Sequence, residues 1–282
     1  KHQDGALMTI YGSIVVQHHA DNIHQKVEGH WTSLLFSFYG GQMNIALIGY
    51  GKMGHEIERC AVERRHAVSQ KFSSRSPVSP SLLAGSDCCI DFSTPLCLDA
   101  NLSSALSAGV PMIIGTTGWE NQLRSVQEKT GQAGGSVLYA SNFSVGANIM
   151  FRLTELAAGM FNRFEQYDIS IHETHHAMKK DAPSGTALTL ASKVLLHVDR
   201  KKRMTTDHAS GSELFISSSR IGTVAGEHTV RFNSPADDIC ISHTAHDRSG
   251  FALGAVLAAE WIVDKKGFFT FEEFLWDHAD LP

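Results

Sequence analysis

The stretch MNIALIGYGKMG, residues 43–54, joins a short apolar run to a glycine-rich turn. Residues 44–48 have the composition of a buried strand, and Gly49, Gly51 and Gly54 follow in the spacing G-x-G-x-x-G. In such turns one glycine permits the tight bend, the second lets backbone approach a pyrophosphate, and the third lets a helix pack on the strand. The stretch therefore predicts a dinucleotide-binding turn, with a purely structural turn as the alternative.

The chain around this turn alternates strands and helices. Strand patterns lie at residues 66–72, 87–93, 110–118 and 135–141, and helical patterns lie at 52–64, 95–109 and 119–131. Alternating strands and helices with short links are typical of βαβ units around a parallel sheet. We therefore expect residues 43–141 to form a doubly wound, Rossmann-like α/β domain.

The second half of the chain has a different pattern. Strand patterns at 167–176, 213–219, 226–232 and 237–245 accompany helical patterns at 144–161 and 185–198. No helices separate the last three strands, which favours an α+β domain with a mixed or antiparallel sheet. An apolar helix is expected at 250–263, and Thr270 with Glu273 has the spacing of a capping box.

The composition excludes several classes of function. The net charge of −5 offers no general attraction for nucleic acid, and no apolar run reaches the roughly 18 residues of a membrane span. The five cysteines form no CxxC pair, which favours reduced thiols in a cytoplasmic protein.

Residues 1–42 differ from the rest of the chain. They hold scattered apolar runs without a clear period, and they lack the basic segment and apolar core of a signal peptide. Because Met43 opens the strand pattern, we expect it to be the natural start. We expect residues 1–42 to be a poorly ordered leader without a role in function.

The end of the second predicted strand bears on the choice of cofactor. NAD-selective sites carry an acid there, about 20 residues after the turn, for the ribose hydroxyls. Here the stretch SQKFSSRS contains Lys71 and Arg75 and no acid. These cations would suit a 2′-phosphate, although solvated surface cations are an equal alternative. The turns at 115–118 and 140–144 follow later strands, where ligands bind in open α/β sheets; ordinary connecting turns are the alternative.

The stretch HETHHAMKKDAPSGTA, residues 172–187, contains the zinc-protease pattern H-E-x-x-H. That pattern chelates only on a helix, but the alternation of residues 167–176 predicts a strand. On a strand, His172 and His176 would lie about 13 Å apart at about 3.3 Å per residue. They could not share one zinc ion, and we expect no metal.

Acid–base chemistry beside an anion site is the alternative for this stretch. Lys179 supplies a positive charge, and Pro183 with Ser184 opens a helix. The first N–H groups of such a helix attract carboxylate or phosphate. A neighbouring histidine can exchange protons near pH 7. Solvated histidines on a structural turn remain the other interpretation.

The order of these motifs resembles the dihydrodipicolinate reductase (4-hydroxy-tetrahydrodipicolinate reductase) family. The chain contains the signature residues Glu173, His175 or His176, Lys179 and Asp181, followed by PSGTA at 183–187. Further matches are GYGKMG, DFSTP, GTTGW, NFSVGAN, GEHTVRF and HTAHDRSGFALGAVLAAEW. The resemblance runs from Met43 nearly to the end of the chain and leaves residues 1–42 without a counterpart.

The resemblance implies an enzyme that reduces a small cyclic dicarboxylate with NADPH or NADH, on the diaminopimelate route to lysine. It implies that His175 is the acid/base residue and Lys179 the proton donor. The substrate carboxylates would be held by His176, Lys179, Ser184, Gly185 and Thr186. An inactive dinucleotide-binding sensor and a zinc hydrolase are the rival functions.

The resemblance also implies the cofactor contacts and the domain division. The cofactor would contact Gly49, Gly51, Lys52, Met53, Gly54, Lys71, Gly115, Thr116, Thr117, Ala140, Ser141, Asn142 and Phe143. Residues 43–141 plus 252–282 would form the dinucleotide-binding domain, and residues 142–251 would bind substrate and form the oligomer. The expected assembly is a homotetramer joined through the sheet of the second domain.

Overall fold

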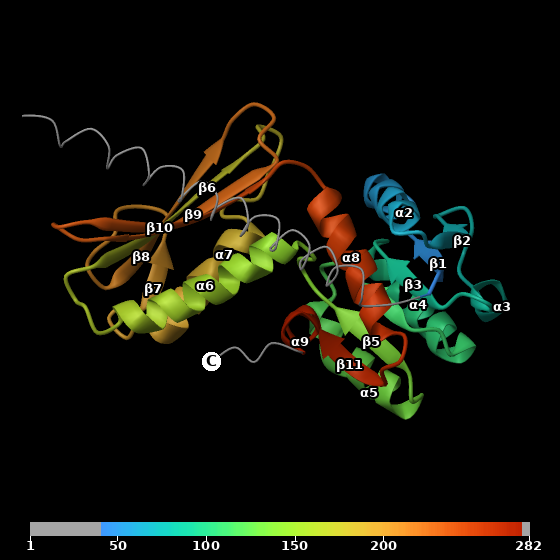
Figure 1. Cartoon of the computed structure of the whole chain (residues 1–282). Coiled ribbons are helices and arrows are strands. Elements are labelled where there is room, and N and C mark those ends of the chain that lie inside the picture. Colours follow the sequence, from blue (N-terminus) through green and yellow to red (C-terminus); the bar gives the residue numbers. More distant parts are fainter. Residues whose placement is uncertain (1–40, 278–282) are drawn as a thin grey trace, which may run out of the picture. The chain divides into compact units, whose positions relative to one another are not determined.

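The computed structural model describes residues 41–277, and those from Met43 onward form one compact unit. The predicted leader, residues 1–42, lies almost entirely outside the described residues. The described elements are arranged around two sheets (Figure 1).

The first sheet is parallel throughout, in the strand order β11-β5-β4-β3-β1-β2. Its strands are β1 (Asn44–Ile48), β2 (Ala67–Phe72), β3 (Cys88–Asp91), β4 (Met112–Ile114), β5 (Ser136–Tyr139) and β11 (Gly267–Thr270). The helices of this part are α2 (Lys52–Glu63), α3 (Pro80–Leu83), α4 (Pro95–Ala108), η1 (Glu120–Gln122), α5 (Leu123–Gln132), α8 (Ser249–Ile262) and α9 (Phe271–Trp276).

The alternation of β1 explains why helices cover both faces of this sheet. Ile45 and Leu47 belong to a core shared with α2 and α8, whereas Ala46 and Ile48 belong to one shared with α4 and α5. All four side chains are buried, as expected for a strand of a doubly wound sheet. The glycine turn after β1 is therefore held at the carboxyl edge of a rigid layer.

The second sheet is mixed, in the order β10-β9-β6-β8-β7. Its strands are β6 (Asp168–His175), β7 (Arg203–Thr205), β8 (Glu213–Arg220), β9 (Gly226–Asn233) and β10 (Asp238–Ala245). Helices α6 (Val145–Phe161) and α7 (Gly185–His197) pack on one face through a core that includes Ile169, Ile171 and Val230. The opposite face carries polar side chains such as His172, Thr229 and Ser242.

The expected fold class is confirmed: a Rossmann-like parallel sheet is joined to a second α+β part with a mixed sheet. The capping box at Thr270 and Glu273 is also present at the start of α9. Three short elements, α3, β7 and β11, were not predicted. The proposed domain boundaries stay a prediction. Among the described residues, no helix is long and apolar enough to cross a membrane.

Candidate active site

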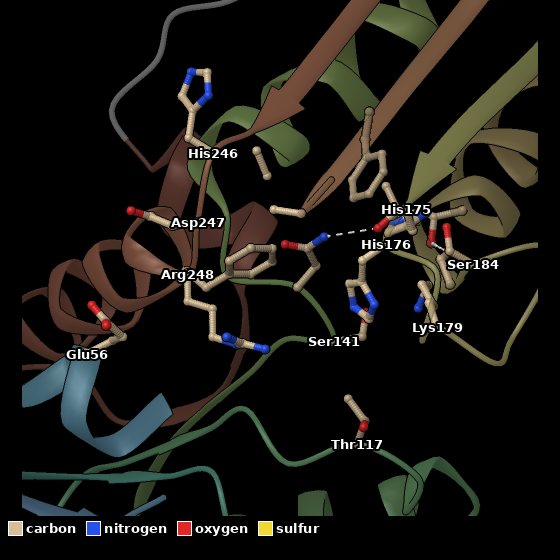
Figure 2. Close-up of a pocket in the computed structure, with 18 of the residues that line it drawn as sticks. Glu56, Thr117, Ser141, His175, His176, Lys179, Ser184, His246, Asp247 and Arg248 are labelled. Carbon is tan, nitrogen blue, oxygen red and sulfur yellow. Dashed lines mark hydrogen bonds between the residues drawn. The ribbon is translucent and has the colours of Figure 1, made fainter. Parts of the chain in front are cut away.

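A cavity of about 830 Å³ is lined by residues from two parts of the fold. Thr117 and Ser141 follow strands of the first sheet, whereas His175 and Gly185 belong to β6 and α7 of the second part. His175, His176, Lys179 and Ser184 gather on one side of this cavity, and Thr117 and Arg248 lie on other sides (Figure 2). The cavity thus brings the histidine-rich stretch together with loops at the carboxyl edge of the first sheet.

The position of His175 follows from the register of β6. It is the last residue of the strand and lies opposite Arg220 of β8. Two residues earlier, Glu173 lies opposite His228 of β9. Because alternate residues of a strand share a face, Glu173 and His175 point to the same side, where both are buried. His172 is exposed and contacts Ser217 Oγ at 2.8 Å instead.

Glu173 is the centre of a buried polar cluster. Its Oε1 accepts hydrogen bonds from Arg220 Nη2 at 3.0 Å and from the backbone N–H of Ser184 at 3.1 Å. Its Oε2 lies 3.4 Å from His175 Nδ1 and 3.6 Å from His228 Nε2. His175 Nδ1 has no hydrogen-bond partner among the described residues, so this carboxylate is the nearest anion to it.

The charges of this cluster set the protonation states. Burial alone would raise the pKa of Glu173, but hydrogen bonds led by Ser184 and including Arg220 lower it to about 2. Burial lowers the pKa of His175; the Glu173 carboxylate opposes this change, and Lys179 adds to it. Burial and the neighbouring His175 lower the pKa of His228 to about 4. At neutral pH the free protein therefore holds an ionised Glu173 beside two histidines that have lost positive charge.

The start of α7 presents backbone N–H groups to the cavity beside His175. Ser184 is the N-cap, and its Oγ accepts a hydrogen bond from Ala187 N. Gly185 and Thr186 line the cavity at the first helical positions, where backbone N–H groups have no partner within the helix. Lys179 also lines the cavity, although its Nζ lies 2.8 Å from Asp181 Oδ2. Two positive features thus face the same space.

The zinc-protease pattern H-E-x-x-H binds a metal only on a helix, but residues 168–175 form a strand. A different set, Glu173, His175 and His228, brings one ligand atom of each residue within 4.8 Å of the others. Arg220 and Lys179 place positive charge beside this set, which disfavours a cation. The absence of a functional metal stays a prediction.

The glycine turn has the features that a pyrophosphate requires. Gly49 has φ +82°, and a Cβ there would lie 2.4 Å from Phe92 O, so only glycine fits. A Cβ on Gly51 would meet nothing within 4 Å, which leaves its backbone open to a ligand. Helix α2 begins after Gly51 without a side-chain cap, whereas α6 and α7 have serine caps. The free N–H groups of Lys52 and Met53 can therefore receive phosphate oxygens.

The other predicted cofactor residues lie in two loops at the same sheet edge. Thr117, Ser141 and Asn142 line the cavity. Thr116, Ala140 and Phe143 are buried behind it, and Gly115 lies against the Phe92 ring, where a Cβ would approach within 2.2 Å. Asp91, which is fully buried at the end of β3, accepts a 2.9 Å hydrogen bond from Thr116 Oγ1 and a 2.7 Å bond from Ser93 N. It thereby ties the loop that holds Thr116 to the loop that follows β3.

Lys71 is exposed, but it is paired with a carboxylate. Its Nζ lies 2.5 Å from Glu58 Oε1 on α2.

The sequence analysis gave no role to Arg220, His228 or Arg248, which contribute to the cluster or line the cavity. The alternation of β6 could have linked Glu173 to His175, but the strands that bring Arg220 and His228 beside them could not be paired from the pattern alone.

Comparisons with known proteins agree with this geometry. Two family models match the chain: "Dihydrodipicolinate reductase, N-terminus" over residues 43–143 and "Dihydrodipicolinate reductase, C-terminus" over residues 146–275. A 4-hydroxy-tetrahydrodipicolinate reductase of Christiangramia forsetii is 40% identical over 235 residues, which cover 83% of this chain and 98% of the relative. The enzyme of that name from Natronomonas pharaonis is 37% identical, covering 82% and 99%.

A solved structure gives the same fold. Dipicolinate-bound dihydrodipicolinate reductase from Paenisporosarcina sp. TG-14 superposes with a TM-score of 0.66 at 22% identity, covering 82% of this chain and 98% of that one. The two family models together span most of the residues from Met43 onward, in the order that the sequence motifs indicated. The chain therefore belongs to the dihydrodipicolinate reductase family.

Proposed function

We propose that this chain reduces 4-hydroxy-tetrahydrodipicolinate (dihydrodipicolinate) to tetrahydrodipicolinate with NADPH or NADH, in diaminopimelate and lysine biosynthesis. One observation carries the proposal: His175, Lys179 and the start of α7 line the same cavity as the loops that hold Thr117 and Ser141. The residues proposed as the acid, the carboxylate site and the cofactor contacts would therefore be adjacent.

The glycine turn would hold the cofactor. The open backbone at Gly51 and the uncapped start of α2 suit its pyrophosphate. Thr117, Ser141 and Asn142 would lie around the nicotinamide end, which supplies a hydride to a conjugated ring carbon. The backbone of both loops is fixed by the hydrogen bonds of Asp91 and by burial of Phe143.

The substrate would place its two carboxylates against the two positive features of the cavity. One carboxylate would accept hydrogen bonds from the free N–H groups of Gly185 and Thr186 at the start of α7, and the Ser184 cap would fix that turn. The other would bind His176 and Lys179, and would replace Asp181 as the partner of the lysine. This arrangement would orient the ring between the helix start and the cofactor loops.

His175 would act as the acid/base residue, with Lys179 beside it as the proton donor. Loss of the 4-hydroxyl group as water would give the conjugated dihydrodipicolinate ring. Hydride addition then develops negative charge on that ring, and a proton must arrive to complete the reduction. In the free protein the pKa of His175 is lowered by burial. A dianionic substrate brings negative charge next to the imidazole and raises that pKa, so substrate binding itself would favour the protonated acid.

Both cofactors would be accepted, and NADPH would be used at least as well as NADH. The loop after β2 carries the exposed Arg75 and no acid, so no side chain of that loop repels a 2′-phosphate. Charge-assisted hydrogen bonds to that phosphate are stronger than neutral ones. The advantage of NADPH should shrink as salt rises and should fall in Arg75→Ala, as measured by kcat/KM for each cofactor.

The test of the proposed function is substrate-dependent oxidation of NADPH and NADH by the purified protein. His175→Gln should lower kcat by roughly 10²–10⁴, the range typical of acid–base catalysis. His172→Gln is the matched control, because this exposed histidine of the same strand faces away from the cavity. No turnover by wild type, or equal turnover by the two variants, would overturn the assignment.

The proposal extends to assembly and location. We expect a homotetramer joined through the second sheet, because helices cover only one face of it among the described residues. We also expect the enzyme to act in the cytoplasm with reduced thiols. Light scattering after size-exclusion chromatography would measure the mass, and a monomer would contradict the expected assembly.

A further inference from the structure

Three side chains meet beside the glycine turn, where α2 lies next to β1 and β2 (Figure 1). Lys71 Nζ lies 2.5 Å from Glu58 Oε1, and Tyr50 donates a hydrogen bond to Glu58 Oε2. The same ammonium lies 4.9 Å from the centroid of the Tyr50 ring. Glu58 therefore joins a residue of the glycine turn to the only cation of β2.

These three residues, the Tyr50–Glu58–Lys71 triad, lie beside the end of β2, where dinucleotide-binding folds select between NADH and NADPH. In dinucleotide-binding folds the residues at the end of the second strand contact the adenosine ribose or its 2′-phosphate. The backbone N–H groups of Gly49 and Tyr50 both donate to Phe72 O, at 3.1 and 2.9 Å. This contact fixes the end of β2 against the turn that would carry the pyrophosphate, with Lys71 one residue before the strand end.

The charges in the triad cancel each other. Hydrogen bonds from Lys71 and then Tyr50 lower the pKa of Glu58, and the hydrogen bond to Glu58 raises the pKa of Lys71. Both groups are therefore ionised at neutral pH and form a true ion pair. A 2′-phosphate would have to separate Lys71 from Glu58 before using it, whereas the hydroxyls of NADH make no such demand.

We propose that Glu58 is a cofactor-selecting residue: it withholds Lys71 from a 2′-phosphate and so keeps NADH competitive with NADPH. The inference rests on the proposed function only in requiring that the glycine turn bind a nicotinamide dinucleotide. Arg75, which makes no ion pair within the described part of the chain, remains available to the phosphate. Glu58 thus limits the preference for NADPH without abolishing it.

A double-mutant cycle on equilibrium binding tests this role. Dissociation constants for NADP⁺ and NAD⁺ are measured by calorimetry, without substrate, for wild type, Glu58→Gln, Lys71→Ala and the double variant. Glu58→Gln should tighten NADP⁺ binding by about three- to tenfold, the size expected for freeing one exposed, salt-screened cation. NAD⁺ binding should change less than about twofold, because its hydroxyls carry no charge for Lys71 to attract.

The cycle separates masking of Lys71 from any general effect of losing a carboxylate. Lys71→Ala alone should leave NADP⁺ binding nearly unchanged, whereas in the Glu58→Gln background it should remove the gain. Glu63→Gln is the matched control on the same helix, because Glu63 pairs with Arg59 and not with Lys71. The gain in Glu58→Gln should also shrink at high salt.

The outcomes distinguish this inference from the proposed function. An unchanged ratio of NADP⁺ to NAD⁺ affinity in Glu58→Gln, or a gain that survives the loss of Lys71, overturns the role of Glu58 while both cofactors still bind. Failure of wild type to bind either dinucleotide overturns the proposed function itself.

Discussion

Replacing Glu173 by Gln removes the anion nearest to His175 while keeping the size of the side chain. In the structure its Oε2 lies 3.4 Å from His175 Nδ1, and the residue is fully buried. An acid catalyst works only while it is protonated, so its contribution is complete below its pKa and disappears as pH rises through that value. Without the carboxylate the imidazolium is less favoured, and the loss of activity should begin at lower pH.

The size of this shift follows from the charge separation. Unit charges about 4 Å apart attract by about 1 kcal/mol in water and about 4 kcal/mol at the effective dielectric constant of a protein surface. At about 1.4 kcal/mol per pKa unit, the basic limb of kcat/KM should move down by roughly 0.7 to 3 units. Arg220 already offsets part of the Glu173 charge, which places the expected shift near the lower end, about 1 unit.

The assay is kcat/KM as a function of pH for wild type, Glu173→Gln and Glu173→Asp. The aspartate keeps the charge, so its basic limb should stay near that of wild type even if its rate is lower. Glu227→Gln is the control, since Glu227 lies on β9 next to His228 but alternates to the other face of the sheet. A folded Glu173→Gln variant with an unchanged pH profile would refute the electrostatic role of the carboxylate.

Three other predictions concern the anion site, the histidine cluster and the last helix. Lys179→Ala should lower kcat and raise KM together, because the lysine would serve both substrate binding and proton supply. The matched control is Lys180→Ala, which changes an exposed neighbour. A Lys179→Ala variant with unchanged kcat and KM would show that Lys179 is not part of the active site. Dialysis against a chelator should leave turnover unchanged. Activity that is lost on dialysis and restored by zinc would contradict the prediction that the enzyme needs no metal ion. Thr270→Ala should destabilise the protein by about 1 kcal/mol through loss of the capping box, measured by thermal unfolding; an unchanged melting temperature would show that the cap contributes little.

The strong periodic elements of the fold could be predicted from the sequence. The predicted strand at 44–48 is β1 (Asn44–Ile48), and the long patterns near α6 and α8 fall within one or two residues of the observed helices. The short elements escaped for physical reasons. β11 is four residues long and gains its strand character from pairing with β5, a contact between residues 131 positions apart that a local pattern does not contain.

The candidate site could also be predicted only in part. The strand at residues 168–175 and the serine cap of α7 could be predicted from the sequence, because alternation and cap chemistry are local. The partners of Glu173 come from β8 and β9, whose order in the sheet depends on tertiary pairing. Lys71 was expected either to suit a 2′-phosphate or to be a solvated surface cation. Its ion pair with Glu58 of α2 depends on side-chain packing between a strand and a helix.

Transfer of deuterium from the cofactor to the product is a direct test of the proposed reduction. Wild type is supplied with 4-hydroxy-tetrahydrodipicolinate and NADPH deuterated at the transferred position, and the product is analysed by mass spectrometry. We expect tetrahydrodipicolinate that carries one deuterium, formed by wild type and His172→Gln at similar rates and by His175→Gln far more slowly. Cofactor oxidation without label in the product, or labelled product formed equally fast by His175→Gln, would contradict it.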